Sequence, residues 1–144
     1  MKTPIVVACD HAGYETKVVV IKHLSEKGHE VFDLGTNSTK AVDYPKYGHM
    51  LGEQIQSGNF KVGISICGSG NGINMVVNKH PGVRAAICWN VEISEMARRH
   101  NDANVCSIPA RYVDKDETIK IIDKFLATGF DGGRHERRIN KIDL

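Results

Sequence analysis

Residues 62–72 read Val-Gly-Ile-Ser-Ile-Cys-Gly-Ser-Gly-Asn-Gly, an apolar run that leads into a cysteine and three closely spaced glycines. The run from Val62 to Ile66 is short and apolar, which is typical of a buried strand. The glycines after it let the backbone turn sharply, and a short helix is expected from Gly70 or Asn71 to Asn78. The stretch therefore predicts a strand, a loop at its carboxyl end, and a helix that starts beside that loop.

The same alternation of apolar runs and amphipathic segments continues on both sides. We expect further strands at 5–9, 31–32, 84–88 and 105–108, and further helices at 15–27, 47–56, 92–100, 117–126 and 134–141. In the first of these helices, the residues expected to face inward are Val18, Val19, Ile21 and Leu24. Strands that alternate with helices form a parallel sheet covered on both faces. The sequence thus predicts an α/β fold, a three-layer α/β/α sandwich of Rossmann-like form with a five-stranded parallel sheet, as a single domain over residues 1–144.

The composition excludes several classes of protein. Of 144 residues, 41% are hydrophobic and 25% are charged, as in soluble globular domains. The formal net charge of +2 gives no reason to expect nucleic acid as a partner. The apolar run at 5–9 is too short for a secretory core or a membrane span, and the four cysteines form no Cys-x-x-Cys pair. We therefore expect a cytoplasmic protein with free thiols that binds neither nucleic acid nor membrane.

The fold itself indicates where a ligand would bind. Open parallel sheets bind ligands beyond the carboxyl ends of their strands, where the strand order reverses. If the first strand lies between the second and the third, that point falls between the loops after strands 5–9 and 62–66. These loops carry Asp10-His11 and Cys67–Gly72. The local pattern and the rule for the fold predict the same place.

The glycine loop is suited to an anion. Its backbone N–H groups can point into one concavity beside a helix N-terminus, which would hold a phosphate or an oxyanion formed during a reaction. The candidate binding residues are Gly68, Ser69, Gly70, Asn71 and Gly72. A dinucleotide fingerprint would need glycine where Ile73 stands, and no Walker lysine follows. The alternative is that the glycines only permit a tight turn.

Cys67 is the candidate reactive group. The positive end of the following helix would stabilise a thiolate there, so Cys67 could act as a nucleophile or as a base. The alternative is a small buried apolar residue, which is how we interpret Cys9, Cys88 and Cys106. A cysteine phosphatase would need an arginine where Ile73 stands, so that mechanism is disfavoured.

Further polar residues could contact a ligand. Asp10 and His11 follow the first strand directly, although a histidine in a loop is often simply solvated. Arg134 and Arg138 share one face of the predicted last helix, with Arg137 adjacent, and paired guanidinium groups match a phosphate dianion. The alternative there is a solvated basic tail. Tyr44, in the predicted rigid turn Asp43-Tyr44-Pro45, could cover a pocket or merely pack.

Taken together, the chain resembles the type B ribose-5-phosphate isomerase family, which also includes the allose-6-phosphate and galactose-6-phosphate isomerases. The resemblance runs nearly end to end. Its markers are Cys-Asp-His at 9–11, Asp-Tyr-Pro at 43–45, Ile-Cys-Gly-Ser-Gly at 66–70, Asn-Lys at 78–79, Arg-Ala at 84–85, Arg-His-Asn-Asp-Ala-Asn at 99–104 and Gly-Gly-Arg-His at 132–135.

The resemblance implies an aldose–ketose isomerase that acts on a sugar phosphate without a metal or a cofactor. Cys67 would move a proton between neighbouring carbons through a cis-enediolate, whose oxygen the amides of Gly68–Gly72 would stabilise. His100 would open the sugar ring, with Asp10 and Asn101 as ring or hydroxyl contacts. The remaining substrate-binding positions that the resemblance implies are His11, Arg111, Arg134 and Arg138, with the arginines on the phosphate.

The resemblance also implies a homodimer or a dimer of dimers, with each site built from two chains. The basic helix at 134–141 or His100 would then serve the partner's site. Some members of the family lack the cysteine and use a glutamate in the glycine loop, whereas this chain, with Cys67, resembles the cysteine type. Pro109 stands where glycine is common in the family, just before Arg111.

Three alternatives to a ribose 5-phosphate isomerase remain open. The same reaction could act on a six-carbon sugar phosphate, either allose 6-phosphate or galactose 6-phosphate, because one sequence does not reveal the length of the pocket. A non-catalytic phosphosugar-binding module is disfavoured by the presence of both Cys67 and His100. A cysteine phosphatase is disfavoured, because this chain lacks the arginine that such an enzyme would need.

Overall fold

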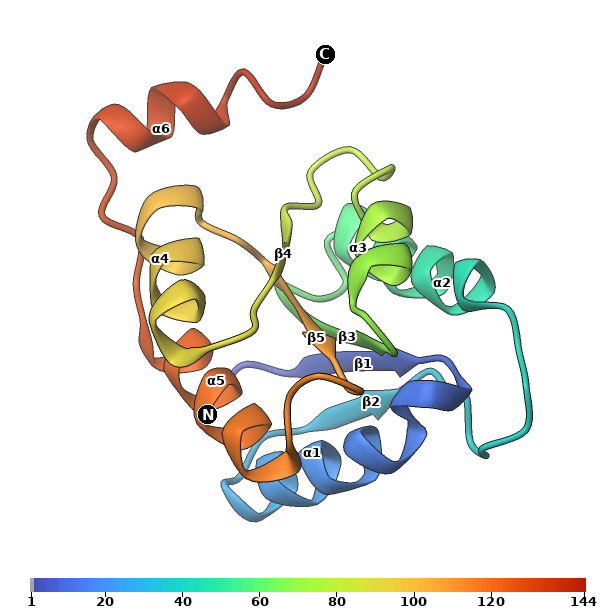
Figure 1. Ribbon diagram of the computed structural model, residues 1–144. Helices are drawn as coiled ribbons and strands as arrows, with labels where there is room; N and C mark the ends of the chain where they lie inside the picture. Colours follow the sequence, from blue (N-terminus) through green and yellow to red (C-terminus); the bar gives the residue numbers. More distant parts are fainter. Residues whose placement is uncertain (1) are drawn as a thin grey trace.

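Five parallel strands form one sheet in the order β2-β1-β3-β5-β4 (Figure 1). The computed structural model describes residues 2–144, so Met1 of the predicted domain 1–144 lies outside the described residues. The strands are β1 (Ile5–Cys9), β2 (Val31–Asp33), β3 (Val62–Cys67), β4 (Ala85–Ile87) and β5 (Val105–Pro109). Because β1 lies between β2 and β3, the strand order reverses at β1, which places the loops after β1 and β3 on either side of that point.

Helices cover both faces of the sheet. They are the 3₁₀ turn η1 (His11–Gly13) and the helices α1 (Tyr14–Glu26), α2 (Tyr44–Gln56), α3 (Asn71–Val77), α4 (Val91–Asn101), α5 (Lys115–Ala127) and α6 (Arg134–Ile139). In Figure 1, α1, α4 and α5 lie on one side of the sheet, and α2 and α3 lie on the other. The predicted three-layer α/β/α sandwich is therefore confirmed.

The core follows from the alternation of side chains along each strand. In β1, Ile5 and Val7 face the layer of α1, α4 and α5, whereas Val6 and Ala8 face α2 and α3. All five residues of β1 are buried, as expected for a parallel strand covered on both faces.

Two local predictions were wrong. The predicted helix 47–56 begins at Tyr44, because Pro45 occupies the first turn, where its missing N–H costs nothing; residues 44–45 are therefore helix and not a rigid turn. Val18 is half exposed instead of facing inward, whereas Leu24 is buried as predicted. Lys17 is buried in place of Val18, because its Nζ donates to Asp33 Oδ1 and to the carbonyl of Thr36.

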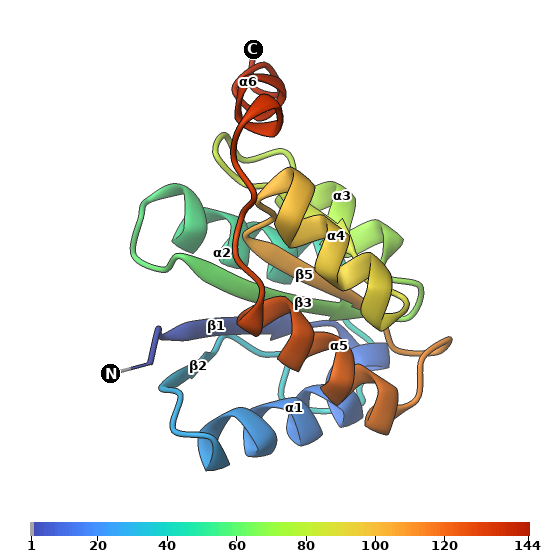
Figure 2. The same ribbon diagram turned by 90° about the vertical axis from the view of Figure 1, so that its left-hand side faces the viewer.

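Helix α6 stands away from the rest of the domain (Figure 2). It begins at Arg134, as predicted, and none of its side chains is buried. After α6 the chain returns to the body, where the Gly82 N–H donates to Asp143 Oδ2 at 3.0 Å. A membrane-crossing helix would have to be longer and more apolar than any found within residues 2–144.

Candidate active site

The loops after β1 and β3 meet at the carboxyl edge of the sheet. Cys9 is paired in register with Ile66, and the Asp10 N–H donates to the Ile66 carbonyl at 3.2 Å. Asp10-His11 and the glycine loop therefore lie side by side, as the strand order predicted.

The glycine loop is pressed against the end of β5. Gly70 has a φ of +76° just before α3, and a Cβ added to it would lie 3.2 Å from the Pro109 nitrogen, so this position requires glycine. Within residues 2–144, the N–H groups of Gly68, Ser69 and Gly70 donate to no acceptor, whereas the Asn71 N–H donates to Ser69 Oγ. The loop thus presents three free donors beside the first turn of α3, which can receive a negatively charged oxygen.

Cys67 is the last residue of β3, and its side chain is buried, with 4% of its surface exposed. The Ala110 N–H donates to its carbonyl at 2.9 Å, which fixes the backbone that carries the thiol. Cys67 lies directly before the free amides of the glycine loop. A thiol in that position can exchange a proton with a ligand whose oxygen those amides bind.

The other cysteines are inert by comparison. Burial raises the pKa of Cys9 to about 12. A hydrogen bond with Cys88, together with burial, raises the pKa of Cys106 well above its ordinary value. Cys88 is fully buried as well. All three fit the interpretation as small buried residues.

Two side chains enclose the glycine loop. A Cβ on Gly68 would lie 2.9 Å from Arg111 Nη1, and a Cβ on Gly72 would lie 2.6 Å from the ring of Tyr44. Arg111 therefore contacts this loop even though Pro109, and not glycine, stands two residues before it. The Arg111 N–H also donates to the Gly68 carbonyl at 2.9 Å. The loop, a guanidinium group and an aromatic ring lie together at one point of the edge.

Asp10 and His11 are held from both sides. The Gly13 N–H donates to Asp10 Oδ1 at 3.1 Å, so the carboxylate caps η1. The Val42 N–H donates to His11 Nδ1 at 3.1 Å. Nδ1 must therefore be unprotonated, and the ring carries its proton on Nε2, where it can donate to an anionic ligand.

The remaining predicted residues lie elsewhere. His100 and Asn101 end α4, which runs back toward the amino-terminal edge of the sheet, and Arg134 and Arg138 belong to α6. Cys67 is paired with Pro109 at the far end of β5, whereas His100 precedes Val105 at its start. At about 3.3 Å per residue, the five residues of β5 separate the two ends by roughly 13 Å. Within one chain, these four residues do not join Cys67.

His100 forms a cluster with two residues near the end of the chain, His135 and Asp131. The rings of His100 and His135 are stacked, with centroids 4.4 Å apart and an angle of 10° between their planes. Desolvation, followed by the charges of His100 and Arg134, lowers the pKa of His135, which favours its neutral form. Asp131 joins the cluster because its N–H donates to the Arg99 carbonyl at 3.0 Å, and its carboxylate pairs with Arg99 Nε at 3.2 Å.

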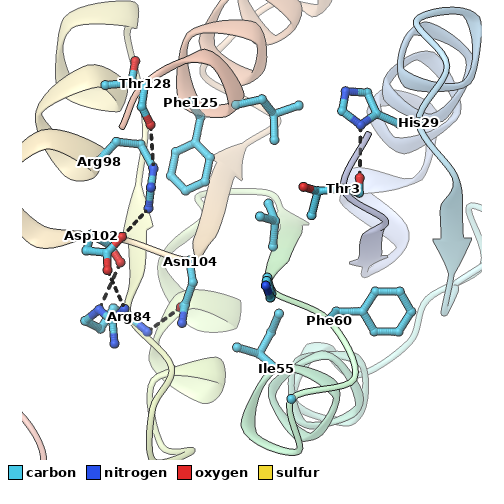
Figure 3. A pocket seen from close by; sticks show the side chains of 14 residues that line it. Thr3, His29, Ile55, Phe60, Arg84, Arg98, Asp102, Asn104, Phe125 and Thr128 are labelled. Atoms are coloured by element: carbon cyan, nitrogen blue, oxygen red, sulfur yellow. Dashed lines mark hydrogen bonds and ion pairs between the residues drawn. The ribbon is translucent and has the colours of Figure 1, made fainter. Parts of the chain in front are cut away.

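A cleft of about 570 Å³ opens on the amino-terminal edge of the sheet (Figure 3). Three of its charged residues are paired with one another, since Asp102 accepts from Arg84 and from Arg98 Nη1, the latter at 2.9 Å. None of the predicted site residues lines it. These ion pairs fix the turn between α4 and β5 and so hold the exposed end of α4.

Sequence reasoning missed a buried polar chain beneath the glycine loop. Ser107 Oγ donates to Asn74 Oδ1 at 2.8 Å, and Ser65 Oγ lies 2.7 Å from Ser107 Oγ. The chain joins β3, β5 and α3. A serine at the middle of two neighbouring apolar strands was the only signal in the sequence.

Comparison with known proteins gives a consistent picture. The family model described as Ribose/Galactose Isomerase matches residues 5–142. The ribose-5-phosphate isomerase B of Escherichia coli is 38% identical over 138 residues, which cover 96% of this chain and 93% of that protein. The structure of a ribose 5-phosphate isomerase from Thermotoga maritima is 43% identical, with a TM-score of 0.97 over 99% of both chains. The structure of ribose-5-phosphate isomerase B from Mycoplasma genitalium with bound ribulose-5-phosphate is 40% identical, with a TM-score of 0.94 over 99% of this chain and 95% of that chain.

Proposed function

The chain belongs to the ribose/galactose isomerase family, among the type B ribose-5-phosphate isomerases, and we propose that it interconverts ribose 5-phosphate and ribulose 5-phosphate through a cis-enediolate. The observation that carries the proposal is the meeting of Cys67, three free backbone amides and Arg111 at one point of the sheet edge. A reaction that creates an oxyanion next to a carbon acid needs a base and such donors together.

Cys67 is the base of the proposed reaction. Its thiolate takes the proton from C2 of the open-chain aldose and returns it to C1, while a hydroxyl proton passes from O2 to O1. The enediolate that forms between these steps is negatively charged at oxygen. The N–H groups of Gly68, Ser69 and Gly70 are free to stabilise that charge, and one donor of this kind is typically worth ~10²–10³ in rate.

Substrate binding uses the groups that surround this point. Arg111 and the Nε2–H of His11 are donors for the phosphate or for hydroxyl groups, and the Tyr44 ring covers the loop on the side of Gly72. Asp10 keeps one carboxylate oxygen available after capping η1. Asn71 and Gly72 complete the loop that faces the sugar.

His100 opens the sugar ring in this proposal, with Asn101 as a hydroxyl contact and Arg134 and Arg138 on the phosphate. These four residues lie at the other edge of the sheet, so they would serve the site of a second chain. Helix α6 has the form needed to reach one, because it stands off the domain and exposes both arginines. The active unit is thus a homodimer, or a dimer of dimers, with shared sites.

The test of the proposal is a comparison of kcat/KM for ribose 5-phosphate, allose 6-phosphate and galactose 6-phosphate. We expect ribose 5-phosphate to be turned over best. A higher value for either six-carbon sugar phosphate would assign the same chemistry to that substrate. If none of the three were turned over, the result would favour a non-catalytic phosphosugar-binding protein.

A further inference from the structure

His135 lies flat against His100, the residue that opens the sugar ring in the proposed reaction. The ring centroids are 4.4 Å apart, and the two planes differ by only 10°. Both side chains are partly buried at the place where α6 meets the last turn of α4. Stacked rings of this kind attract each other beyond the burial of their surface. The contact therefore favours one orientation of the His100 ring.

The orientation of the His100 ring decides where it can exchange a proton. The nitrogen atoms of an imidazole donate and accept in the plane of the ring, and rotation about the Cβ–Cγ bond of a histidine has only broad energy minima. His135 covers one face of the ring and opposes this rotation. Because the two planes are nearly parallel, the two rings do not direct their nitrogen atoms at one common point. His135 is thus placed to hold the His100 ring and not to share its proton.

Contacts with α4 hold His135 in this place. The Asp131 N–H donates to the Arg99 carbonyl at 3.0 Å, and the Asp131 carboxylate pairs with Arg99 Nε at 3.2 Å. Gly132 and Gly133 follow with φ values of +69° and +59°, which other residues rarely adopt, and they turn the chain into α6. Since no side chain of α6 is buried, this tether and the stack set the position of the helix against α4.

The stack is compatible with a His100 ring that changes its charge. Desolvation, followed by the charges of His100 and Arg134, lowers the pKa of His135, whereas Asp131 opposes this shift. His135 is therefore neutral when the neighbouring ring takes up a proton, so two positively charged rings do not face each other. His100 can then gain and lose a proton while the stack remains in place.

We propose that His135 is a positioning residue for ring opening, because by stacking on His100 it fixes the plane in which that ring exchanges its proton. This inference rests on the proposed function. In the ring-opening step the bond between C1 and the ring oxygen breaks, the ring oxygen gains a proton from His100, and the C1 hydroxyl loses one to solvent as it becomes the aldehyde. His135 touches neither of these protons. Its neighbours Arg134 and Arg138 have a different role, since they bind the phosphate in that proposal.

The two directions of the reaction separate ring opening from proton transfer at carbon. Ribose 5-phosphate is bound as a closed ring, so its conversion needs both steps. Ribulose 5-phosphate has no free C5 hydroxyl with which to close a ring, and the aldehyde that it yields can close without the enzyme, so its conversion does not need ring opening. The equilibrium constant ties the two kcat/KM values together, and the maximal rates, kcat, are therefore the quantities to compare.

We expect His135→Ala to lower kcat for ribose 5-phosphate about three- to tenfold, and kcat for ribulose 5-phosphate by less than about twofold. His135→Phe keeps a flat ring without its nitrogen atoms and should restore kcat for ribose 5-phosphate to within about twofold of the parent. Glu136→Ala, which truncates the neighbouring exposed side chain of α6, is the matched control and should change neither rate.

Three outcomes overturn the proposal. An unchanged kcat in His135→Ala would show that the stack contributes nothing to ring opening. Equal losses in both directions would mean that α6 has moved and that its arginines carry the effect. A His135→Phe variant as slow as His135→Ala would mean that a nitrogen atom of His135 is required, and not the flat ring.

NMR of the histidine ring protons tests the stack without reference to activity. The His100 signal is identified by its loss in His100→Asn. We expect this signal to shift in His135→Ala, because the ring current of the stacked neighbour is removed, and to show a ring-current displacement again in His135→Phe. An identical His100 signal in the parent and in His135→Ala overturns the stack itself. A parent that shows the stack but does not convert ribose 5-phosphate would refute the proposed function, and with it the role in ring opening, while the contact stands.

Discussion

Cys67 is shielded from bulk water, yet it adjoins the amides that would hold a developing oxyanion. Its position at the end of β3 is fixed because Cys67 is paired with Pro109 of β5 and the preceding Ile66 is paired with Cys9 of β1. A base placed in this way needs no movement of the backbone to act. The loop that follows it contributes backbone donors, and Ile73, where a cysteine phosphatase would need its arginine, is fully buried in the core.

We therefore expect Cys67→Ala to lower kcat by ~10²–10⁴, the usual contribution of a general base, while sugar-phosphate binding survives. Steady-state kinetics and calorimetric binding of ribulose 5-phosphate measure the two effects separately. Cys88→Ala, which removes a buried thiol away from the site, is the matched control. Turnover at the parent rate in Cys67→Ala would remove the thiol from the mechanism.

The buried thiols make stability depend on alkaline pH. The pKa of Cys9 is raised from 9.0 to about 12 by burial, so the folded state keeps a proton that the unfolded state loses. The stability held below pH 9 is therefore lost as the pH rises from about 9 toward 12, by at most ~1.4 kcal/mol per pH unit for this group. Urea unfolding of the parent and of Cys9→Ala at about pH 8 and about pH 10 should show the smaller decline in the variant. An equal decline in both would mean that Cys9 ionises freely in the fold.

At the scale of elements, the apolar runs predicted every strand, because residues such as those of β1 are buried on both faces and cannot be polar. The start of α2 was missed although Pro45 is a common first-turn residue, because Asp-Tyr-Pro also fits a turn. The burial of Lys17 in place of Val18 could not be predicted. The groups at 33–37 that accept hydrogen bonds from Lys17 come close to it only in the folded chain. Local sequence thus specified the elements and not the buried polar contacts between them.

Helix α3 should depend on the polar chain of Ser65, Ser107 and Asn74. Ser107→Ala leaves the buried Ser65 hydroxyl and the partly buried Asn74 amide without this partner, so we expect it to lower the free energy of unfolding by ~1–3 kcal/mol. Ser25→Ala, at an exposed position of α1, is the control and should change it by no more than about 0.5 kcal/mol. Chemical denaturation measures both variants. Equal stability of the two would show that the chain beneath the glycine loop contributes nothing.

For the whole molecule, the decisive feature is that the proposed site is divided between the two edges of the sheet. The sequence carried the information for Cys67, Asp10 and the glycine loop to meet, because the strand-order rule places them at one reversal point. It also contained the direction of α4, which returns His100 to the opposite edge in any parallel fold of this kind. What one sequence does not contain is the surface through which two copies would join, since such a surface depends on faces that form only in the folded chain.

The proposed sharing of sites between two chains makes a specific prediction for mixed variants. In a hybrid dimer of Cys67→Ala and His100→Asn chains, one site receives both defects, whereas the other combines an intact Cys67 with an intact His100. If the two purified, nearly inactive variants are unfolded and refolded together, half of the dimers are hybrids, and activity should recover to about a quarter of the parent value. Each variant refolded alone is the control. Activity that stays at the mean of the two separate variants would show that Cys67 and His100 act from the same chain, which the roughly 13 Å between the edges of the sheet makes difficult to reconcile with this fold.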